Sequence, residues 1–195
     1  MQHFYRTVPG WATFEPLYFE MVANAPDAPT KSHFVEVGSW LGRSAALMAV
    51  EIINSSKPIR FDCVDPWTDG GPDLRHKVAG MKMPIYEQFL RNIEPVKDMI
   101  RPIRLPSIEA AATYEDGTLD FVMIDASHAY EDVKADIAAW LPKLKPGGIL
   151  GFDDFNWSGV KQAVRDMLDP DKLHVYSGPP RPNHAGPCKW AAYTC

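Results

Sequence analysis

The stretch "MIDASHAYEDVKADIAAWLPKLKPGGILGFDDF", Met123 to Phe155, contains a complete strand–helix–strand unit. Its apolar ends, "MID" and "ILGFDD", indicate two buried strands. Between them, the 3.6-residue spacing of apolar side chains predicts a helix from Tyr130 to about Lys143, closed by "PGG". Two strands joined through a helix are expected to lie parallel, with a right-handed crossover. Both strands end in acidic residues, which raises the question of whether those residues form a site.

The same alternation of strands and helices continues along the whole chain. It predicts a single domain, 1–195, with a doubly wound, Rossmann-like α/β fold and a seven-stranded, mostly parallel sheet. The last two strands, 172–178 and 188–194, have only a turn between them and are expected to form a C-terminal antiparallel hairpin. Residues 1–32 are interpreted as an N-terminal helical extension. The Gly- and Pro-rich segment 66–84 is interpreted as a lid or substrate loop.

Composition excludes several classes of function. The chain has 195 residues, of which 46% are hydrophobic and 23% charged, and a net charge of -5. No run of Lys or Arg suggests a nucleic acid or an anionic membrane as partner. No apolar run approaches the ~18 residues of a membrane span, and the first residues lack the order of a signal peptide. Three cysteines make no disulfide framework. We therefore expect a cytoplasmic protein.

The first predicted strand ends in a glycine turn, "EVGSWLGRS", Glu36 to Ser44. Gly38 and Gly42 permit a tight turn and a close backbone approach. The spacing is G-x-x-x-G and not G-x-G-x-x-G, so a nicotinamide cofactor is not favoured. Asp65 ends the second strand, where a carboxylate can accept hydrogen bonds from ribose hydroxyls. Together these features predict a nucleoside-containing cofactor, although a glycine turn also joins strand to helix in many folds.

Three aspartates end the two strands of the opening stretch: Asp125 ends one, and Asp153 and Asp154 end the other. Neighbouring strands lie ~4.8 Å apart, so the three carboxylates are expected to converge if the strands are adjacent. A divalent cation would relieve their repulsion, and all-oxygen ligation favours Mg²⁺ or Ca²⁺ over zinc. The alternative is structural, with Asp125 starting a turn and Asp153 capping a helix.

His128 follows Asp125 by three residues and precedes the predicted helix. Beside a cation it could remove a proton from a metal-bound hydroxyl, since an unperturbed imidazole has a pKa of ~6.5. The alternative is an exposed loop histidine, with Ser127 as the helix cap.

Several motifs resemble those of class I S-adenosylmethionine-dependent methyltransferases. "FVEVGSWLGRSAALMA" resembles the first motif, "FDCVDPW" the second acidic position and "LKPGGILGFDD" the fifth-strand region. The pairing of Asp-x-x-His with Asp-Asp resembles metal-dependent small-molecule O-methyltransferases, including those acting on macrolide and aminocoumarin sugars. The resemblance runs from about Phe34 to Val164.

The resemblance implies roles for individual residues. The cofactor S-adenosylmethionine would be bound by residues of the glycine turn and of later strand ends, namely Glu36, Gly38, Ser39, Gly42, Ser44, Asp65, Ser107 (near the adenine) and Asp125. Mg²⁺ would be held by Asp125, Asp153 and Asp154. His128 would be the general base, with Asp125 as the second catalytic residue.

These roles imply methyl transfer to a hydroxyl of a small-molecule acceptor, with a vicinal diol on a sugar or a catechol as the best chelator of the cation. Trp67, His76 and Trp157 are predicted acceptor contacts. A homodimer remains open. Two other functions also remain open: a non-catalytic S-adenosylmethionine-binding module, and a different transferase on this scaffold, such as an aminopropyl transferase, whose chemistry needs no divalent ion.

Overall fold

A single seven-stranded sheet forms the centre of the computed structural model, which describes residues 1–68, 83–179 and 186–195. Its strands are β1 (Ser32–Val37), β2 (Ile59–Val64), β3 (Arg101–Ile103), β4 (Leu119–Ile124), β5 (Leu144–Phe152), β6 (Leu173–Gly178) and β7 (Cys188–Thr194). The strand order is β3-β2-β1-β4-β5-β7-β6. The pairs from β3 to β5 are parallel, and β7 pairs antiparallel with both β5 and β6. The predicted doubly wound sheet with a C-terminal antiparallel hairpin is confirmed.

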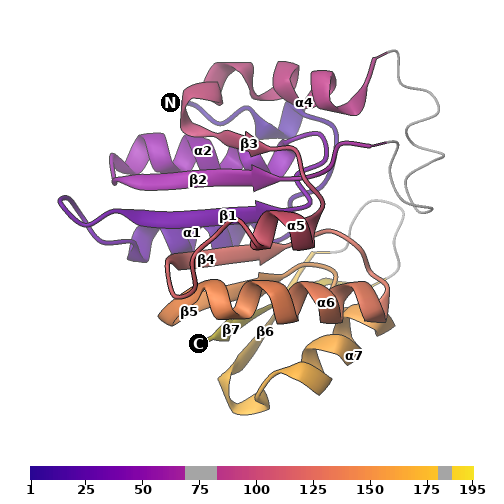
Figure 1. The fold of residues 1–195 in the computed structure, drawn as a ribbon. Helices are drawn as coiled ribbons and strands as arrows, with labels where there is room; N and C mark the ends of the chain where they lie inside the picture. The colour runs from indigo at the N-terminus through magenta and orange to yellow at the C-terminus, as the bar shows by residue number, and fades with distance from the viewer. Residues whose placement is uncertain (69–82, 180–185) are drawn as a thin grey trace.

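Helices cover both faces of the sheet (Figure 1). The α-helices are α1 (Glu15–Asn24), α2 (Arg43–Ser55), α4 (Ile85–Ile93), α5 (Ser107–Ala111), α6 (Tyr130–Trp140) and α7 (Ser158–Met167). Short 3₁₀ segments lie at Tyr5–Thr7, Glu94–Met99, Leu141–Lys143 and Pro170–Lys172. One apolar core packs α1, α2 and α4 on one face, and a second packs α5, α6 and α7 on the other. No helix in the described part of the chain is long and apolar enough to cross a membrane.

The start of β5 differs from the prediction. The strand begins at Leu144 and includes the "PGG" that was expected to close the preceding helix. The backbone explains the difference: Gly147 N–H donates to the Cys195 carbonyl at 3.0 Å, and Cys195 N–H donates to the Gly148 carbonyl at 3.0 Å. Pairing with the end of the chain therefore draws these glycines into the sheet. A local pattern contains no sign of a partner so distant in sequence.

The register of the parallel strands aligns their carboxyl ends. Val37 pairs with both Val64 and Ile124, and Ile124 pairs with Phe152. Backbone bonds continue this alignment past the strands, because Asp125 N–H donates to the Val37 carbonyl at 2.8 Å and Asp153 N–H to the Ile124 carbonyl at 3.1 Å. Residues following β1, β2, β4 and β5 therefore share one edge of the sheet, as expected for a ligand site in such folds.

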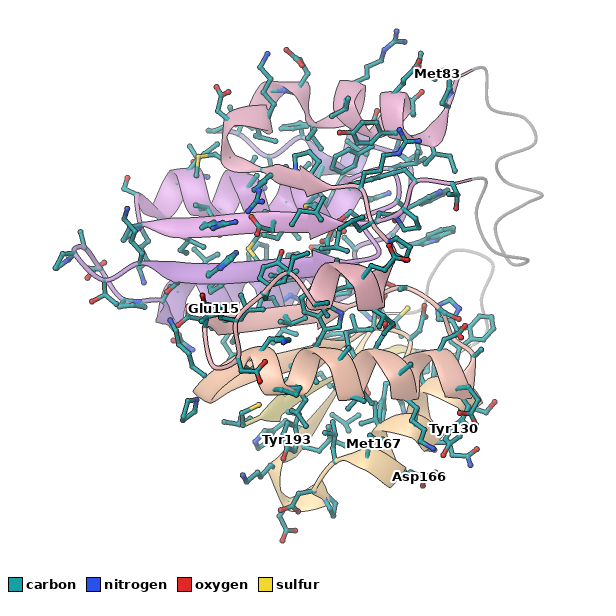
Figure 2. The ribbon with its side chains drawn as sticks, in the orientation of Figure 1. Met83, Glu115, Tyr130, Asp166, Met167 and Tyr193 are labelled. Atoms are coloured by element: carbon teal, nitrogen blue, oxygen red, sulfur yellow. The ribbon has the colours of Figure 1, made fainter. Side chains whose placement is uncertain are left out.

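The first residue of α6 is hydrogen-bonded to the last turn of α7. The Tyr130 hydroxyl donates to Asp166 Oδ2 at 3.1 Å, and both side chains are visible together in Figure 2. Lys134 Nζ lies 5.6 Å from the centre of the Tyr130 ring. These contacts fix the first turn of α6, and with it the loop that connects β4 to α6.

Candidate functional site

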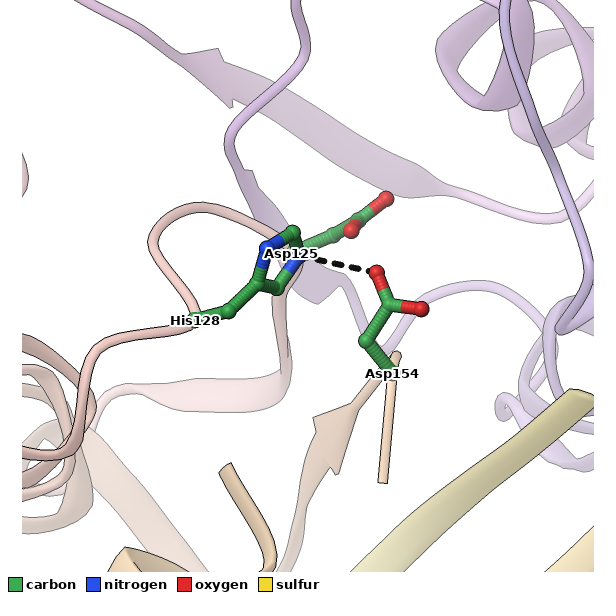
Figure 3. A group of neighbouring side chains, drawn as sticks. All are labelled: Asp125, His128 and Asp154. Carbon is green, nitrogen blue, oxygen red and sulfur yellow. Dashed lines mark ion pairs between the residues drawn. The ribbon is translucent and has the colours of Figure 1, made fainter. Parts of the chain in front are cut away.

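Three side chains converge where β4 and β5 end: Asp125, His128 and Asp154 (Figure 3). His128 Nε2 lies 2.8 Å from Asp154 Oδ2. One ligand atom from each residue lies within 4.8 Å of the others. Asp154 is buried, whereas Asp125 and His128 are partly exposed. Two carboxylates and an imidazole at this spacing are suited to holding a cation, and the cluster sits at the aligned edge of the sheet.

Asp153 makes a different contact from the other predicted cation ligands. Both of its carboxylate oxygens accept from the Thr13 hydroxyl, at 2.8 and 3.0 Å. The side chain is only 3% exposed. Both aspartates follow β5, which ends at Phe152, and the chain turns at Asp154, whose φ is +53°. Consequently Asp154 faces His128, while Asp153 faces the segment that precedes α1.

His128 is fixed from several sides. Its ring stacks on Trp157, with centroids 4.6 Å apart and planes at 21°. The start of α7 lies close to its backbone, since a Cβ on Gly159 would come within 2.3 Å of the His128 carbonyl oxygen. His128 Nδ1 is buried and has no hydrogen-bond partner among the described residues. The imidazole therefore presents Nε2, and not Nδ1, to the acidic cluster.

Glu36, at the end of β1, is fully buried. Its Oε2 accepts from the Tyr18 hydroxyl at 2.6 Å, and its Oε1 has no hydrogen-bond partner among the described residues. Burial raises the pKa of Glu36, and the Tyr18 hydroxyl offsets only part of that effect. Ser39 and Ser44, also predicted cofactor residues, are buried nearby. An orphaned carboxylate oxygen here is available to a cationic or hydrogen-bond-donating group of a ligand.

The two glycines of the turn have structural reasons for lacking side chains. A Cβ on Gly38 would lie 2.0 Å from the Asp125 carbonyl oxygen, so the glycine lets the ends of β1 and β4 come together. A Cβ on Gly42 would lie 2.9 Å from Ile93 Cγ2 and 3.0 Å from Phe89. Gly42 therefore allows α4 to pack against the turn, a role that does not depend on a cofactor.

Asp65 lies at the end of β2, as predicted for a ribose-binding carboxylate. Its oxygens accept from two backbone N–H groups, those of Trp40 at 2.9 Å and Trp67 at 2.7 Å. Burial raises the pKa of Asp65, against the lowering effect of both amides. The amides orient the carboxylate, and each of its oxygens has a second lone pair for a hydroxyl.

The Ser107 side chain, predicted to lie near the adenine, is hydrogen-bonded to two residues of α6. Its hydroxyl donates to Asp136 Oδ1 and accepts from Trp140 Nε1 at 2.9 Å. Asp136 is a buried carboxylate in α6, and burial raises its pKa to about 6. This contact joins α5 to α6, and it gives Ser107 a packing role at the position where the adenine was expected.

The three residues predicted to contact the acceptor, Trp67, His76 and Trp157, differ in their exposure and surroundings. Trp67 is buried, its ring 4.5 Å from that of Phe89, and its Nε1 donates to the Trp40 carbonyl at 2.7 Å. Trp157 is 43% exposed beside His128 and remains available to a ligand. His76, and most of the predicted lid at 66–84, lie outside the described residues.

Thr13 and Tyr18 are site residues that the sequence did not reveal. Both precede β1, and both contact acidic residues at strand ends, namely Asp153 and Glu36. Trp11 belongs to the same segment and stacks on Trp40, with ring centroids 5.2 Å apart. No local motif marks these residues. Their only sequence signal is the aromatic and amphipathic character of the segment, which does not specify where it packs.

The residues at the strand ends fit both groups that the sequence implies, a divalent cation and a nucleoside-containing cofactor. For a divalent cation, the cluster of Asp125, His128 and Asp154 supplies two carboxylates and one imidazole. For a cofactor with an amino acid and a nucleoside portion, the orphaned Oε1 of Glu36 and the oriented carboxylate of Asp65 lie at neighbouring strand ends.

Comparison with known proteins adds independent findings. A family model described as a methyltransferase domain matches residues 35–155. The uncharacterized protein y4gI of Sinorhizobium fredii is 27% identical over 158 residues, which are 78% of this chain and 16% of that protein. The chain thus spans about a sixth of the length of this curated relative.

Two solved structures share the fold. The O-methyltransferase NovP is 18% identical, with a TM-score of 0.64 over 92% of this chain and 78% of that chain. The apo structure of CalS11, a TDP-rhamnose 3'-O-methyltransferase, is 19% identical, with a TM-score of 0.54 over 90% of this chain and 75% of that chain. The shared sheet and helices are those in which the site described above is built.

Proposed function

The chain belongs to the methyltransferase domain family, and from this membership we propose that it transfers the methyl group of S-adenosylmethionine to a hydroxyl oxygen of a small molecule, assisted by a divalent cation. The observation that carries the proposal is the convergence of Asp125, His128 and Asp154 at the aligned strand ends. This cluster lies one strand away from Glu36 in the sheet, since β1 and β4 are neighbours. A cofactor at β1 and β2 and an acceptor at β4 and β5 would thus meet along one edge.

The reaction is a displacement in which the hydroxyl oxygen bonds to the methyl carbon and the carbon–sulfur bond breaks. The sulfonium becomes the neutral thioether of S-adenosylhomocysteine, and the hydroxyl proton is released. The chain holds the two reactants in line, which can account for much of the rate. A bound divalent cation would lower the pKa of the acceptor hydroxyl and fix its orientation.

Residues of the described site divide between the two reactants. Glu36 and Asp65 are proposed to hold the cofactor, the first through its orphaned oxygen and the second through an oriented carboxylate. Asp125 and Asp154 are proposed to hold the cation. Trp157 is proposed to contact the acceptor, because it is 43% exposed and stacks on His128 at the edge of the cluster.

A vicinal diol is the proposed acceptor group, since two adjacent oxygens can chelate one cation. NovP is an O-methyltransferase and CalS11 a TDP-rhamnose 3'-O-methyltransferase. Sharing their fold, this chain is proposed to act on a sugar hydroxyl, with a catechol as the other diol to be tried. A cytoplasmic location is part of the same proposal.

The test is methyl transfer from labelled S-adenosylmethionine to a panel of sugar nucleotides and catechols. We expect transfer to a diol, loss of transfer with a chelator, and a fall of about 100-fold in Asp154→Asn, as for loss of a charged group acting on the reacting oxygen. Asp116→Asn is the matched control, since Asp116 is an exposed carboxylate paired with Lys143. Transfer that proceeds unchanged in Asp154→Asn and in chelator would contradict the cation-assisted mechanism.

Calorimetry with S-adenosylhomocysteine tests the proposed cofactor site. A catalytic protein is expected to bind this product, and Asp65→Ala is expected to weaken binding by about 100-fold or more, because two hydrogen bonds to a charged acceptor are lost. Binding unaffected by Asp65→Ala would place the cofactor elsewhere. Binding without transfer to any diol, and without any effect of added cation, would favour the non-catalytic module.

A further inference from the structure

We infer that His128 is a ligand of the cation through Nε2 and not the general base, and that Asp153 is not a ligand. The site then has two carboxylate oxygens, from Asp125 and Asp154, and one imidazole nitrogen. This inference rests on the proposed function, which supplies the cation. It changes both the class of metal expected and the route of the proton.

The orientation of the imidazole supports a ligand role. Nε2 points into the cluster, 2.8 Å from Asp154 Oδ2. Nδ1 is the only other ring atom that could accept a proton, and it is buried without a partner among the described residues. The stacked Trp157 ring and the close approach of Gly159 hold this orientation. A nitrogen that faces two carboxylates is placed to share a cation with them, whereas the nitrogen facing away cannot reach an acceptor.

Asp153 lies outside the group of side chains whose ligand atoms converge, which consists of Asp125, His128 and Asp154. Its two oxygens are hydrogen-bonded to Thr13, on the side of the sheet where α1 packs. Asp154, its neighbour, points to His128. Asp153 therefore tethers the segment that precedes α1 to the end of β5, and the pair of adjacent aspartates contributes one ligand instead of two.

The spacing of the cluster suits a cation with small adjustments. Two ligand atoms each ~2.1 Å from a metal are at most ~4.2 Å apart. The ligand atoms of Asp125, His128 and Asp154 lie within 4.8 Å of one another, so a side-chain shift of less than about 1 Å brings them to that limit. A site that includes imidazole nitrogen favours a first-row transition-metal dication over Mg²⁺, which prefers oxygen ligands throughout.

The route of the proton follows from this ligand set. When the Nε2 lone pair is donated to the cation, it is not available to accept the hydroxyl proton. The proton must therefore pass to a carboxylate oxygen of the cluster or to water. Methyl transfer remains balanced: the oxygen–carbon bond forms, the carbon–sulfur bond breaks, and one proton is released.

Spectroscopy with Mn²⁺ as the probe tests the inference without an activity assay. Electron spin echo envelope modulation of the Mn²⁺-loaded protein is expected to show coupling to ¹⁴N of an imidazole. That coupling is expected to disappear in His128→Gln, and Mn²⁺ affinity is expected to fall by about 10-fold or more in His128→Gln and Asp154→Asn. Asp153→Asn and Thr13→Val are the matched controls, with affinities within about 2-fold of the unsubstituted protein, because neither removes a ligand. Thermal unfolding of each variant verifies that it is folded.

Each outcome distinguishes the inference from the proposed function. Mn²⁺ binding without ¹⁴N coupling, or binding weakened as much by Asp153→Asn as by Asp154→Asn, overturns the inference and leaves cation-assisted transfer intact. Absence of Mn²⁺ binding overturns the cation site as a whole. S-adenosylhomocysteine binding, measured separately by calorimetry, then still tests the cofactor half of the proposed function.

Discussion

The Tyr18 hydroxyl donates a hydrogen bond of 2.6 Å to Glu36 Oε2, joining helix α1 to the carboxyl end of β1 inside the core. Both residues are fully buried. Because burial raises the pKa of Glu36, ionising this carboxylate in the folded state is unfavourable. Among the hydrogen bonds that act against this effect, that of the Tyr18 hydroxyl is the largest, ahead of those of Ser39 and Ser44.

Removing that donor should destabilise the protein. Tyr18→Phe removes one hydrogen bond from the buried carboxylate, and a lost hydrogen bond to a charged group costs about 1.5–3 kcal/mol. We expect the free energy of unfolding at pH 8, from urea denaturation, to fall by that amount. In a double-mutant cycle with Glu36→Leu, which has no acceptor for the Tyr18 hydroxyl, the two losses should not add, since each removes the same bond. Strictly additive losses would show that the pair is not coupled.

The order of strands could be predicted from the sequence, because apolar runs alternate with helical patterns along the whole chain. The "PGG" at 146–148 shows the limit of that reasoning. Read locally it ends a helix, whereas in the structure it lies in β5, where Gly147 and Gly148 pair with Cys195. Propensity is a local property, and pairing with a residue nearly fifty positions away overrides it.

The Asp136 carboxyl should make stability depend on pH. Burial raises its pKa to about 6 from the ordinary 3.8, so the folded state binds this proton more tightly than the unfolded state. For this group, the free energy of unfolding therefore decreases as pH rises from about 4 to about 6, and it is constant above that. Asp136→Asn removes the ionisation while keeping an acceptor for Ser107.

The test for Asp136 is chemical denaturation of both proteins at pH 4.5 and pH 8. Asp136→Asn is expected to gain about 1–3 kcal/mol relative to the unsubstituted protein at pH 8, and much less at pH 4.5. An equal effect at both values would mean that the carboxyl does not titrate in this window. Glu131→Gln, at an exposed position of the same helix, is the control.

Asp62, on β2, should show the opposite pH dependence. Asp62 is fully buried. Its carboxylate accepts hydrogen bonds from Arg60 Nε at 3.1 Å and from the Tyr114 hydroxyl at 3.0 Å, and its Oδ2 lies 2.8 Å from His33 Nε2. Burial acts to raise its pKa, but the hydrogen bonds from His33 and Arg60 hold the pKa below 3.8. Its contribution to stability is thus complete above about pH 4 and is lost as pH falls through the lowered pKa.

Asp62→Asn tests this sign. At pH 7 we expect a loss of about 2–3 kcal/mol in the free energy of unfolding, because Arg60 loses its buried counter-charge. The loss should shrink as the pH falls below 3.8. Mn²⁺ binding should not change, since Asp62 lies within β2 and the cluster lies beyond β4 and β5. A loss independent of pH would point to packing instead of charge.

The candidate site was only partly predictable. Asp125, His128 and Asp154 could be located because strand ends of a parallel sheet share one edge. The contact between Asp153 and Thr13 could not be predicted, since it depends on how a segment distant in sequence packs against the end of β5. Ser107 is similar: its position beyond β3 was predicted, but its hydrogen bonds to Asp136 and Trp140 depend on how α5 meets α6.

Gly159 is predicted to control the position of His128. A Cβ there would lie 2.3 Å from the His128 carbonyl oxygen and 2.9 Å from Tyr130 N, so Gly159→Ala must push α7 and the His128 loop apart. Overpacking of this kind costs about 1–3 kcal/mol, even though alanine favours a helix more than glycine does. Because the shift moves Nε2 relative to Asp154, both the Mn²⁺ affinity and the stability should fall.

Ser158→Ala, at the exposed neighbouring position, should change neither the Mn²⁺ affinity nor the stability. Calorimetric titration with Mn²⁺ and thermal unfolding of the two variants measure both effects. Gly159→Ala with unchanged affinity would show that the cation site does not depend on the placement of this loop.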